Sequence, residues 1–165
     1  MNASRVEGLV RVVGAGLLGT SIGLALRARG VEVAIEDASP ANEKLAIDYG
    51  AGRRALAGDA PSLIVVCVPP DVTARVVAAE LVAHPHAVVT DVASVKGSIQ
   101  KALAERGIVA ANYVGSHPMA GRERGGAISG RADLFISRPW IISASPESAS
   151  CAVRAVENLA LELGA

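Results

Sequence analysis

Aromatic side chains are scarce in this chain, since Phe, Trp and Tyr together supply only 2% of its 165 residues. A large aromatic core is therefore excluded, and the interior must be built from Val, Ile, Leu and Ala. Hydrophobic residues make up 51% of the sequence, enough for one domain with a real core. Valine-rich runs between alanine-rich helical patterns are typical of a parallel sheet covered on both faces.

Neither sign of charge is in excess. The chain has 16 Lys and Arg against 16 Asp and Glu, and no basic stripe. Proteins that bind nucleic acid or anionic membranes concentrate basic residues on one face. We therefore expect neither nucleic acid nor a membrane as a partner.

Cysteine is equally scarce. Cys67 lies in an apolar run and Cys151 in a helical pattern, so both are predicted to be small buried hydrophobes in a reducing compartment. The N-terminus lacks the charged-then-apolar design of a secretory signal, and no apolar stretch is long enough to span a bilayer. We expect a soluble, cytoplasmic protein.

A glycine pattern, Gly14-x-Gly16-x-x-Gly19, follows the predicted strand 9–13 and precedes the predicted helix 17–29. Such a loop turns the strand sharply, lets a pyrophosphate approach the backbone, and brings helix and strand together. The N–H groups at the helix start, including Leu17 and Leu18, would face the phosphates. The alternative is a strand–turn–helix that uses glycine for geometry alone.

An acidic pair ends the second predicted strand, in which Val31, Val33 and Ile35 alternate. Glu36 and Asp37 lie about twenty residues past the glycines, where a carboxylate accepts hydrogen bonds from an adenosine ribose. Its charge would repel the 2′-phosphate of NADP, so NAD is the predicted cofactor. Asp37 is the first choice and Glu36 the second; the alternative is two surface acids. Together these features predict an α/β fold, a Rossmann-type doubly wound, mostly parallel sheet with helices on both faces.

Further apolar runs predict the remaining elements. The most apolar run, 62–68, predicts a central strand that Pro69 ends, with Asp71 or Thr73 capping the next helix. Val68 and Pro69 would then line the cofactor crevice at the carboxyl end of that strand. The other predicted elements are an edge strand within 50–60, helix 41–49, strand 87–90, a helix to 106, strands 108–114 and 139–143, and helix 148–163.

Three polar side chains are candidates for chemistry. Ser94, at a strand-to-helix junction, is either a helix N-cap or a hydroxyl beside the nicotinamide. His117, between glycine and proline, is either a structural histidine or a base that takes a proton from a hydroxyl as hydride leaves. Glu123, in a glycine-rich segment predicted to be a mobile loop, either closes over substrate or faces water.

Two other histidines, His84 and His86, flank Pro85 in a polar loop. The two histidines could bind a metal together, but the favoured interpretation is that both are solvated residues of a loop. No metal site is predicted.

Three segments resemble the nucleotide-binding domain of prephenate dehydrogenases and their arogenate-using relatives. They are 14–26 (GAGLLGTSIGLAL), 90–96 (TDVASVK) and 115–121 (GSHPMAG), with Glu123 and 132–135 (ADLF) at the family's spacing. The first segment is shared by many dehydrogenases, whereas the other two, in this order, are specific.

The resemblance implies NAD-dependent oxidative decarboxylation of prephenate to 4-hydroxyphenylpyruvate, on the route to tyrosine. It assigns His117 as the catalytic base, Ser94 as the residue that orients it, and Glu123 to a gating loop. One alternative is a hydroxyacid or imino-acid reductase, but the catalytic lysine expected of such an enzyme is missing from the later helices. Another is a non-catalytic NAD-binding module.

Residues 1–165 are predicted to form the NAD-binding domain alone. The family continues into a helical region that forms a homodimer and supplies groups for the substrate's carboxylates, and we expect that region to be absent here. This chain alone is therefore expected to bind NAD but to turn over prephenate poorly.

Overall fold

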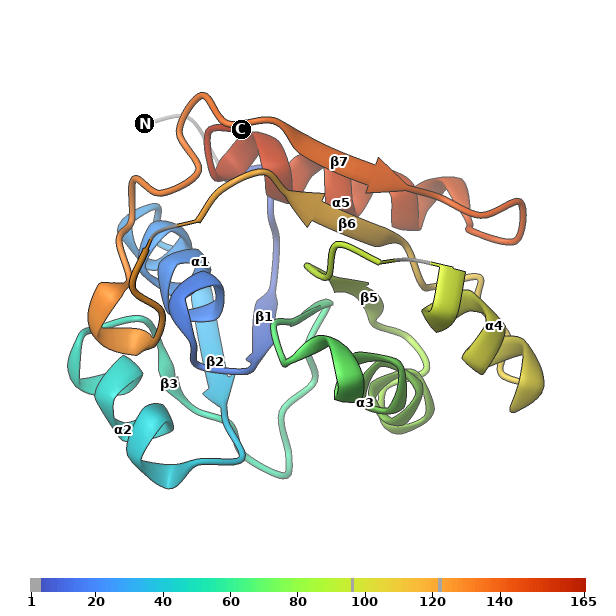
Figure 1. Cartoon of the computed structure of the whole chain (residues 1–165), viewed down its shortest axis with the longest axis horizontal. Coiled ribbons are helices and arrows are strands. Elements are labelled where there is room, and N and C mark those ends of the chain that lie inside the picture. The colour runs from blue at the N-terminus through green and yellow to red at the C-terminus, as the bar shows by residue number, and fades with distance from the viewer. Residues whose placement is uncertain (1–3, 96, 122) are drawn as a thin grey trace.

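A five-stranded parallel sheet forms the centre of the computed structural model, which describes residues 4–95, 97–121 and 123–165 (Figure 1). Its strand order is β3-β2-β1-β4-β5. The strands are β1 (Leu9–Val13), β2 (Glu32–Glu36), β3 (Arg53–Arg54), β4 (Leu63–Val66) and β5 (Val88–Asp91). The predicted strands 9–13, 62–68 and 87–90 and the predicted edge strand are confirmed.

The sheet reverses its winding direction at β1. β1 pairs with β2 on one side and with β4 on the other, so the chain moves outward first through β2 and β3, and then through β4 and β5. The helices that follow β1 and β4 therefore leave the sheet in opposite directions from the carboxyl ends of these two neighbouring strands. Open α/β sheets bind ligands at this switch point.

Helices cover both faces of the sheet. They are α1 (Leu17–Ala28), α2 (Pro40–Asp48), α3 (Pro70–Ala83), α4 (Gly97–Glu105) and α5 (Ser150–Glu162), with a 3₁₀ turn, η1 (Ala127–Ser129). Val10 and Val12 of β1 belong to the same core cluster as Ile22 of α1, whereas Val13 packs in a second cluster with Val77 of α3. The period-two alternation of β1 thus divides the core between two layers, and the predicted Rossmann-type fold is confirmed.

A two-stranded antiparallel sheet, β6 (Gly115–Pro118) and β7 (Trp140–Ser143), extends the structure beyond β5. The predicted strand 108–114 is wrong. Tyr113 donates its N–H to the Ala110 carbonyl in a turn, and an isolated bridge between Val89 and Tyr113, rather than a strand, pairs this segment with the backbone of β5. Strand pairing starts at Gly115, opposite β7, and Val109 is 80% exposed.

Two other local predictions are wrong. Neither Asp71 nor Thr73 caps α3: Pro69 is its N-cap residue, and the Thr73 hydroxyl donates to the Pro69 carbonyl at 2.9 Å. Cys151 is exposed on α5 rather than buried, because Ala152 and Val156 form the buried stripe of that helix. No helix in the described ranges is long and apolar enough to cross a membrane.

Helix α1 approaches the segment before β3 at Gly23. A Cβ atom on Gly23 would lie 2.3 Å from the Ala51 carbonyl oxygen. Helix propensity alone favours alanine over glycine by about 1 kcal/mol. The contact with rigid backbone is the larger effect, because overpacking costs about 1–3 kcal/mol.

We therefore predict that Gly23→Ala lowers the free energy of unfolding by about 1 kcal/mol or more in urea denaturation. Gly58→Ala is the matched control, since a Cβ there meets no atom within 4 Å, and its change should stay within about 0.5 kcal/mol. Equal stability of the two variants would contradict this account of the packing between α1 and the segment before β3.

Candidate nucleotide-binding and catalytic site

Two glycines of the loop between β1 and α1 are required by the protein's own backbone. Gly14 has a φ of +103°, and a Cβ there would lie 2.4 Å from the Cys67 carbonyl oxygen. A Cβ on Gly19 would lie 1.9 Å from the Gly14 carbonyl oxygen. No side chain fits at either position, so Gly14 joins the loops after β1 and β4, and Gly19 packs α1 against the turn.

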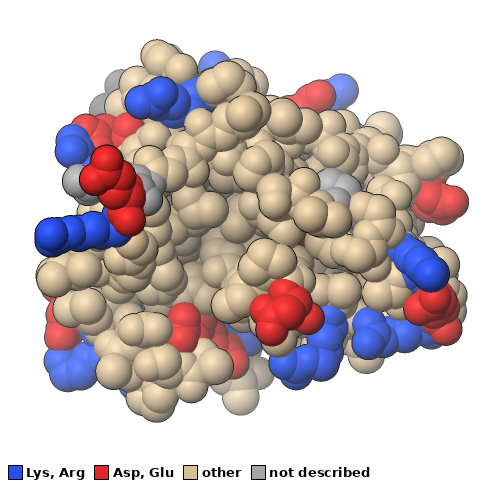
Figure 2. Space-filling view, viewed as in Figure 1, with Lys and Arg blue, Asp and Glu red and all other residues tan. Residues whose placement is uncertain are grey.

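The middle glycine is different. A Cβ on Gly16 would have no atom within 4 Å, and its φ of −79° is one that any residue adopts. Gly16 is the N-cap residue of α1, and no described side chain caps that helix. Figure 2 shows a hollow between α1 and α3, bordered mainly by uncharged residues. The amino end of α1, with Leu17 and Leu18, thus has no side-chain cap, and anion binding there stays a prediction.

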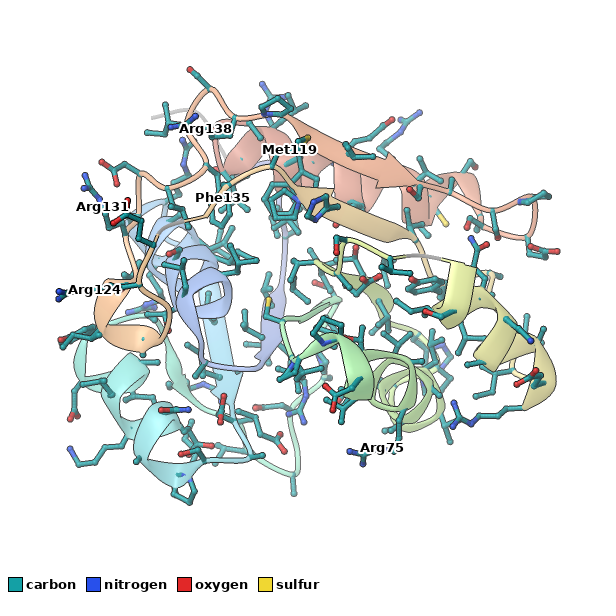
Figure 3. The ribbon with its side chains drawn as sticks, in the orientation of Figure 1. Arg75, Met119, Arg124, Arg131, Phe135 and Arg138 are labelled. Carbon is teal, nitrogen blue, oxygen red and sulfur yellow. The ribbon has the colours of Figure 1, made fainter. Side chains whose placement is uncertain are left out.

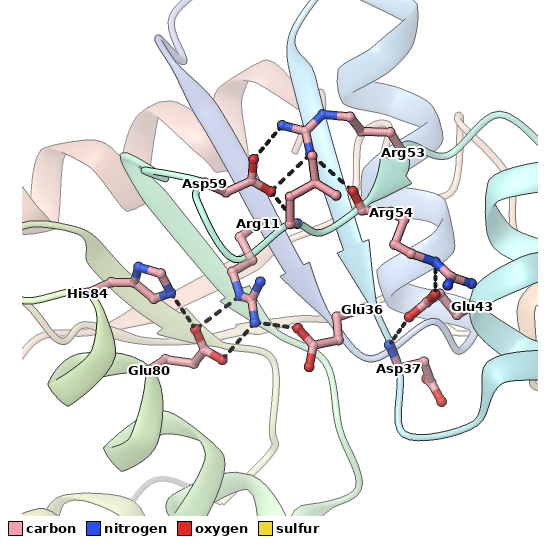
Figure 4. Close-up of polar contacts among 10 residues, drawn as sticks. Arg11, Glu36, Asp37, Glu43, Arg53, Arg54, Asp59, Glu80 and His84 are labelled. Atoms are coloured by element: carbon pink, nitrogen blue, oxygen red, sulfur yellow. Dashed lines mark hydrogen bonds and ion pairs between the residues drawn. The ribbon is translucent and has the colours of Figure 1, made fainter.

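The two acids at the end of β2, Glu36 within the strand and Asp37 directly after it, have different partners. Asp37 Oδ2 accepts the Ala15 N–H at 2.6 Å, and Oδ1 accepts the Ser39 N–H at 2.7 Å. Glu36 instead forms an ion pair with Arg11 of β1 (Figure 4). Both acids line a pocket of about 400 Å³, but only Asp37 is held against the glycine loop. This placement favours Asp37 over Glu36 as the ribose ligand, which stays a prediction.

The loop after β4 forms the other wall. The Val68 N atom lies 3.1 Å from the position that a Gly14 Cβ would occupy. Val68 therefore lies beside the glycine loop, and Pro69 is the next residue in the chain. Burial, aided by the charge of Asp91, raises the pKa of the Cys67 thiol, and the group stays neutral. The contact of Cys67 with Gly14 is made by its backbone carbonyl.

His117 lies within β6 rather than after a strand. Its Nδ1 is 3.3 Å from the carbonyl oxygen of Val92, the residue after β5. Because a carbonyl only accepts, this contact requires the proton on Nδ1, and Nε2 is then left as the basic nitrogen. The half-buried imidazole is thus oriented by the backbone of the neighbouring strand.

Buried polar groups fix the position of that carbonyl. Asp91 is fully buried, and its Oδ2 accepts the Tyr113 hydroxyl at 2.6 Å while its Oδ1 accepts the Ala93 N–H at 2.9 Å. The Ser116 hydroxyl donates to the Asp91 carbonyl at 2.9 Å. Burial first, and then the Asp91 charge, raise the pKa of Tyr113, which stays a hydroxyl donor. The bonds of Tyr113 and Ser116 tie the end of β5 to the residues that precede His117.

Two predicted catalytic residues lie in loops. Ser94 is exposed and precedes Gly97, the first residue of α4, by three positions, so the N-cap interpretation is wrong. Glu123 is also exposed. Lys96 of the 90–96 motif and Arg122, where the glycine-rich segment begins, lie outside the described residues. The structure leaves the substrate contacts of Ser94 and Glu123 as predictions.

Arginines that could bind a dicarboxylate do not converge. Figure 3 shows Arg124, Arg131 and Arg138 along the outer edge beside α1, and Arg75 below α3 on the other side. Arg131 is paired with Asp133 in a bidentate contact, with Nε–Oδ1 at 2.7 Å and Nη2–Oδ2 at 2.6 Å. These four side chains form no clamp.

His84, one of the two loop histidines, has a partner of its own, Glu80 Oε2, at 3.6 Å. Within the described ranges no group of three or more His, Cys, Asp or Glu could hold a metal.

Sequence reasoning missed the ion pairs around the carboxyl end of β2. Glu80 of α3 binds Arg11 with Oε2 3.1 Å from Nε, and Glu43 of α2 binds Arg54. One signal was present: Arg11 is a lone charge in the apolar strand Leu-Val-Arg-Val-Val. Such a residue needs buried partners, but the sequence does not say which acids supply them.

The fold and the open glycine loop define a nucleotide-binding α/β domain. Residues 22–165 match the family model described as prephenate dehydrogenase, nucleotide-binding domain. The chain belongs to this family, which confirms the resemblance. The matched region starts inside α1, so the glycine loop precedes it.

Known relatives agree with this assignment. The Streptomyces niveus protein described as a probable prephenate dehydrogenase, NovF, is 39% identical over 150 residues, which cover 90% of this chain and 41% of NovF. The fold matches the arogenate dehydrogenase of Synechocystis, with 23% identity and a TM-score of 0.84 over 95% of this chain and 57% of that one. It also matches the A. aeolicus prephenate dehydrogenase in complex with hydroxyphenyl propionate and NAD+, with 23% identity and a TM-score of 0.86 over 96% and 58%. The chain thus spans about two fifths of NovF and somewhat over half of these structures.

Tyr113→Phe tests the buried pair beneath His117. It leaves one oxygen of a fully buried carboxylate without the Tyr113 hydroxyl, and losing a hydrogen bond to a buried charged group costs about 1.5–3 kcal/mol. We predict that loss in urea unfolding. Tyr49→Phe, at a ring that is 44% exposed, is the control and should change stability by less than about 0.5 kcal/mol. A Tyr113→Phe variant as stable as this control would show that the pair contributes nothing.

Proposed function

We propose that this chain is the NAD-binding half of a dehydrogenase that oxidatively decarboxylates prephenate, with arogenate as the alternative substrate. The observation that carries the proposal is the open amino end of α1 at Gly16, next to a carboxylate that is held against the same loop. Family membership and the NAD+ complex of the A. aeolicus relative support it.

The residues present fit a dinucleotide. The open space over Gly16 and the uncapped N–H groups of Leu17 and Leu18 suit a pyrophosphate, and Asp37 suits a ribose diol. Asp37 Oδ1 and Oδ2 each accept one N–H, and a carboxylate has about four acceptor sites, so capacity for ribose hydroxyls remains. When bound, NAD supplies a hydride acceptor at its nicotinamide.

His117 is the proposed base. With Nδ1 held by the Val92 carbonyl, Nε2 takes the proton from the substrate's ring hydroxyl as that carbon is oxidised. Loss of carbon dioxide leaves an aromatic ring, so the protein need only orient the reactants and move one proton. Ser94 would contact the same hydroxyl, and Glu123 would belong to a loop that covers the substrate.

The groups that bind the carboxylates of prephenate are proposed to lie outside residues 1–165. Two observations support this: Arg75, Arg124, Arg131 and Arg138 do not converge, and the chain spans 41% of NovF. We infer that the missing contacts come from a helical region that also forms a homodimer, and that the 165-residue chain alone is a poor catalyst.

We predict that His117→Ala, made in the longest product of the gene, lowers kcat for NADH formation from prephenate or arogenate by about 10²–10⁴-fold. Absorbance at the NADH band follows the reaction, and the KM for NAD should be unchanged. His86→Ala, in the loop after α3, is the control and should retain full activity. A loss below about tenfold would argue against general-base catalysis, and no turnover by the wild type with either substrate would refute the proposed function.

A further inference from the structure

Charged side chains gather in the pocket at the carboxyl end of β2, beside the predicted ribose ligand Asp37 (Figure 4). Three acids and three basic residues line it: Glu36, Asp37 and Glu43, and Arg11, Arg54 and His84. Any group attached to the ribose hydroxyls would meet these charges first.

The basic residues of this pocket already have acidic partners. Arg11 is paired with Glu36 and Glu80, and its side chain is only 12% exposed. His84 is paired with Glu80. Arg54 donates from Nε to Glu43 Oε1 at 2.7 Å, and its side chain is 64% exposed. Arg54 is therefore the most exposed of the three side chains, whereas Arg11 is enclosed between two acids.

Glu43 links Arg54 to the predicted ribose site. Its second oxygen, Oε2, accepts the Asp37 N–H at 3.4 Å, and its side chain is 11% exposed. Glu43 thus adds a second carboxylate beside that of Asp37 and also neutralises the one exposed guanidinium that lines this pocket.

NAD and NADP differ by a single phosphate on the adenosine ribose. Rossmann-type proteins that accept NADP bind this 2′-phosphate with a nearby arginine, and those that prefer NAD present an acid to the free hydroxyl. Here the arginine, Arg54, is present, but it forms an ion pair with Glu43. A 2′-phosphate at Asp37 would therefore meet two carboxylates, while the guanidinium of Arg54 is already engaged.

We propose that Glu43 is a specificity-determining residue: it excludes NADP by holding Arg54 in an ion pair. This inference rests on the proposed binding of NAD at Asp37. Removing the charge of Glu43 releases Arg54 to the 2′-phosphate and reduces the repulsion there. Asp37 still repels the phosphate in that variant, so the NADP affinity rises without reaching that of a dedicated NADP site.

The test is isothermal titration calorimetry of the 165-residue chain with NADH and NADPH. Wild type should bind NADH in preference to NADPH. Glu43→Gln keeps the shape of the side chain and should improve the affinity for NADPH about tenfold, the scale of one charge-assisted hydrogen bond, with NADH affinity changed less than about threefold. In Glu43→Gln/Arg54→Ala this gain should disappear.

Glu32→Gln is the matched control. Glu32 is paired with Arg53 at 2.9 Å on the same edge of the sheet but does not line the pocket, so NADPH affinity should not change. Should Glu43→Gln not fold by circular dichroism, Glu43→Ser serves the same purpose.

Different outcomes separate the two proposals. If the wild type binds no NADH, the proposed function fails. If it binds NADH but Glu43→Gln gains no affinity for NADPH, or the double variant keeps the gain, the role of Glu43 is overturned while NAD binding stands.

Discussion

The contact between the backbones of the two loops that follow β1 and β4 determines how the rest of the site is arranged. Gly14 lies so close to the Cys67 carbonyl that no side chain fits between them, and Gly19 lies equally close to Gly14. A contact between two backbone segments is rigid, because neither has a side chain that could rotate to relieve it. It fixes the amino end of α1 at the switch point of the sheet. It also leaves Gly16 at a position where a Cβ atom would meet no described atom within 4 Å.

The position of His117, the proposed base, depends on a similar use of backbone. The carbonyl of Val92 orients His117, and this carbonyl is fixed because Asp91, the residue before it, is buried and bonded to Tyr113 and the Ala93 N–H. A buried carboxylate is costly unless its hydrogen bonds are satisfied, so this arrangement is stable only in one geometry. His117, the proposed base, is thereby positioned by β5 and β6, whereas the predicted nucleotide loop belongs to β1 and α1. The two halves meet at the carboxyl edge of the sheet.

The sequence predicted the elements whose signals are local. Strands 9–13 and 62–68 are apolar runs with sharp ends, and the glycine spacing located the first turn. The prediction failed where tertiary contacts decide: strand 108–114 is replaced by a turn, and pairing starts at Gly115 because β7 supplies its partner. Cys151 was predicted to be buried because its helix is amphipathic. The spacing of the apolar residues does not show which positions beside the apolar stripe are covered by the rest of the protein.

The candidate site was predictable in part for the same reason. Asp37 and His117 lie next to motifs that could be recognised along the chain. The partners of Arg11 and Arg54 come from α3 and α2, 69 and 11 positions away, and no local pattern connects them. The family resemblance added roles for Ser94 and Glu123 that neither spacing nor the structure supplies.

The most direct measurement of the central claim compares NADH binding with stability in Gly16→Val. The account predicts that this variant folds, with a free energy of unfolding within about 1 kcal/mol of wild type, since a side chain at Gly16 meets no protein atom. Its affinity for NADH should nevertheless fall at least about tenfold in calorimetry, because the side chain fills the space reserved for the pyrophosphate. A stable Gly16→Val variant that binds NADH as tightly as wild type would contradict the account.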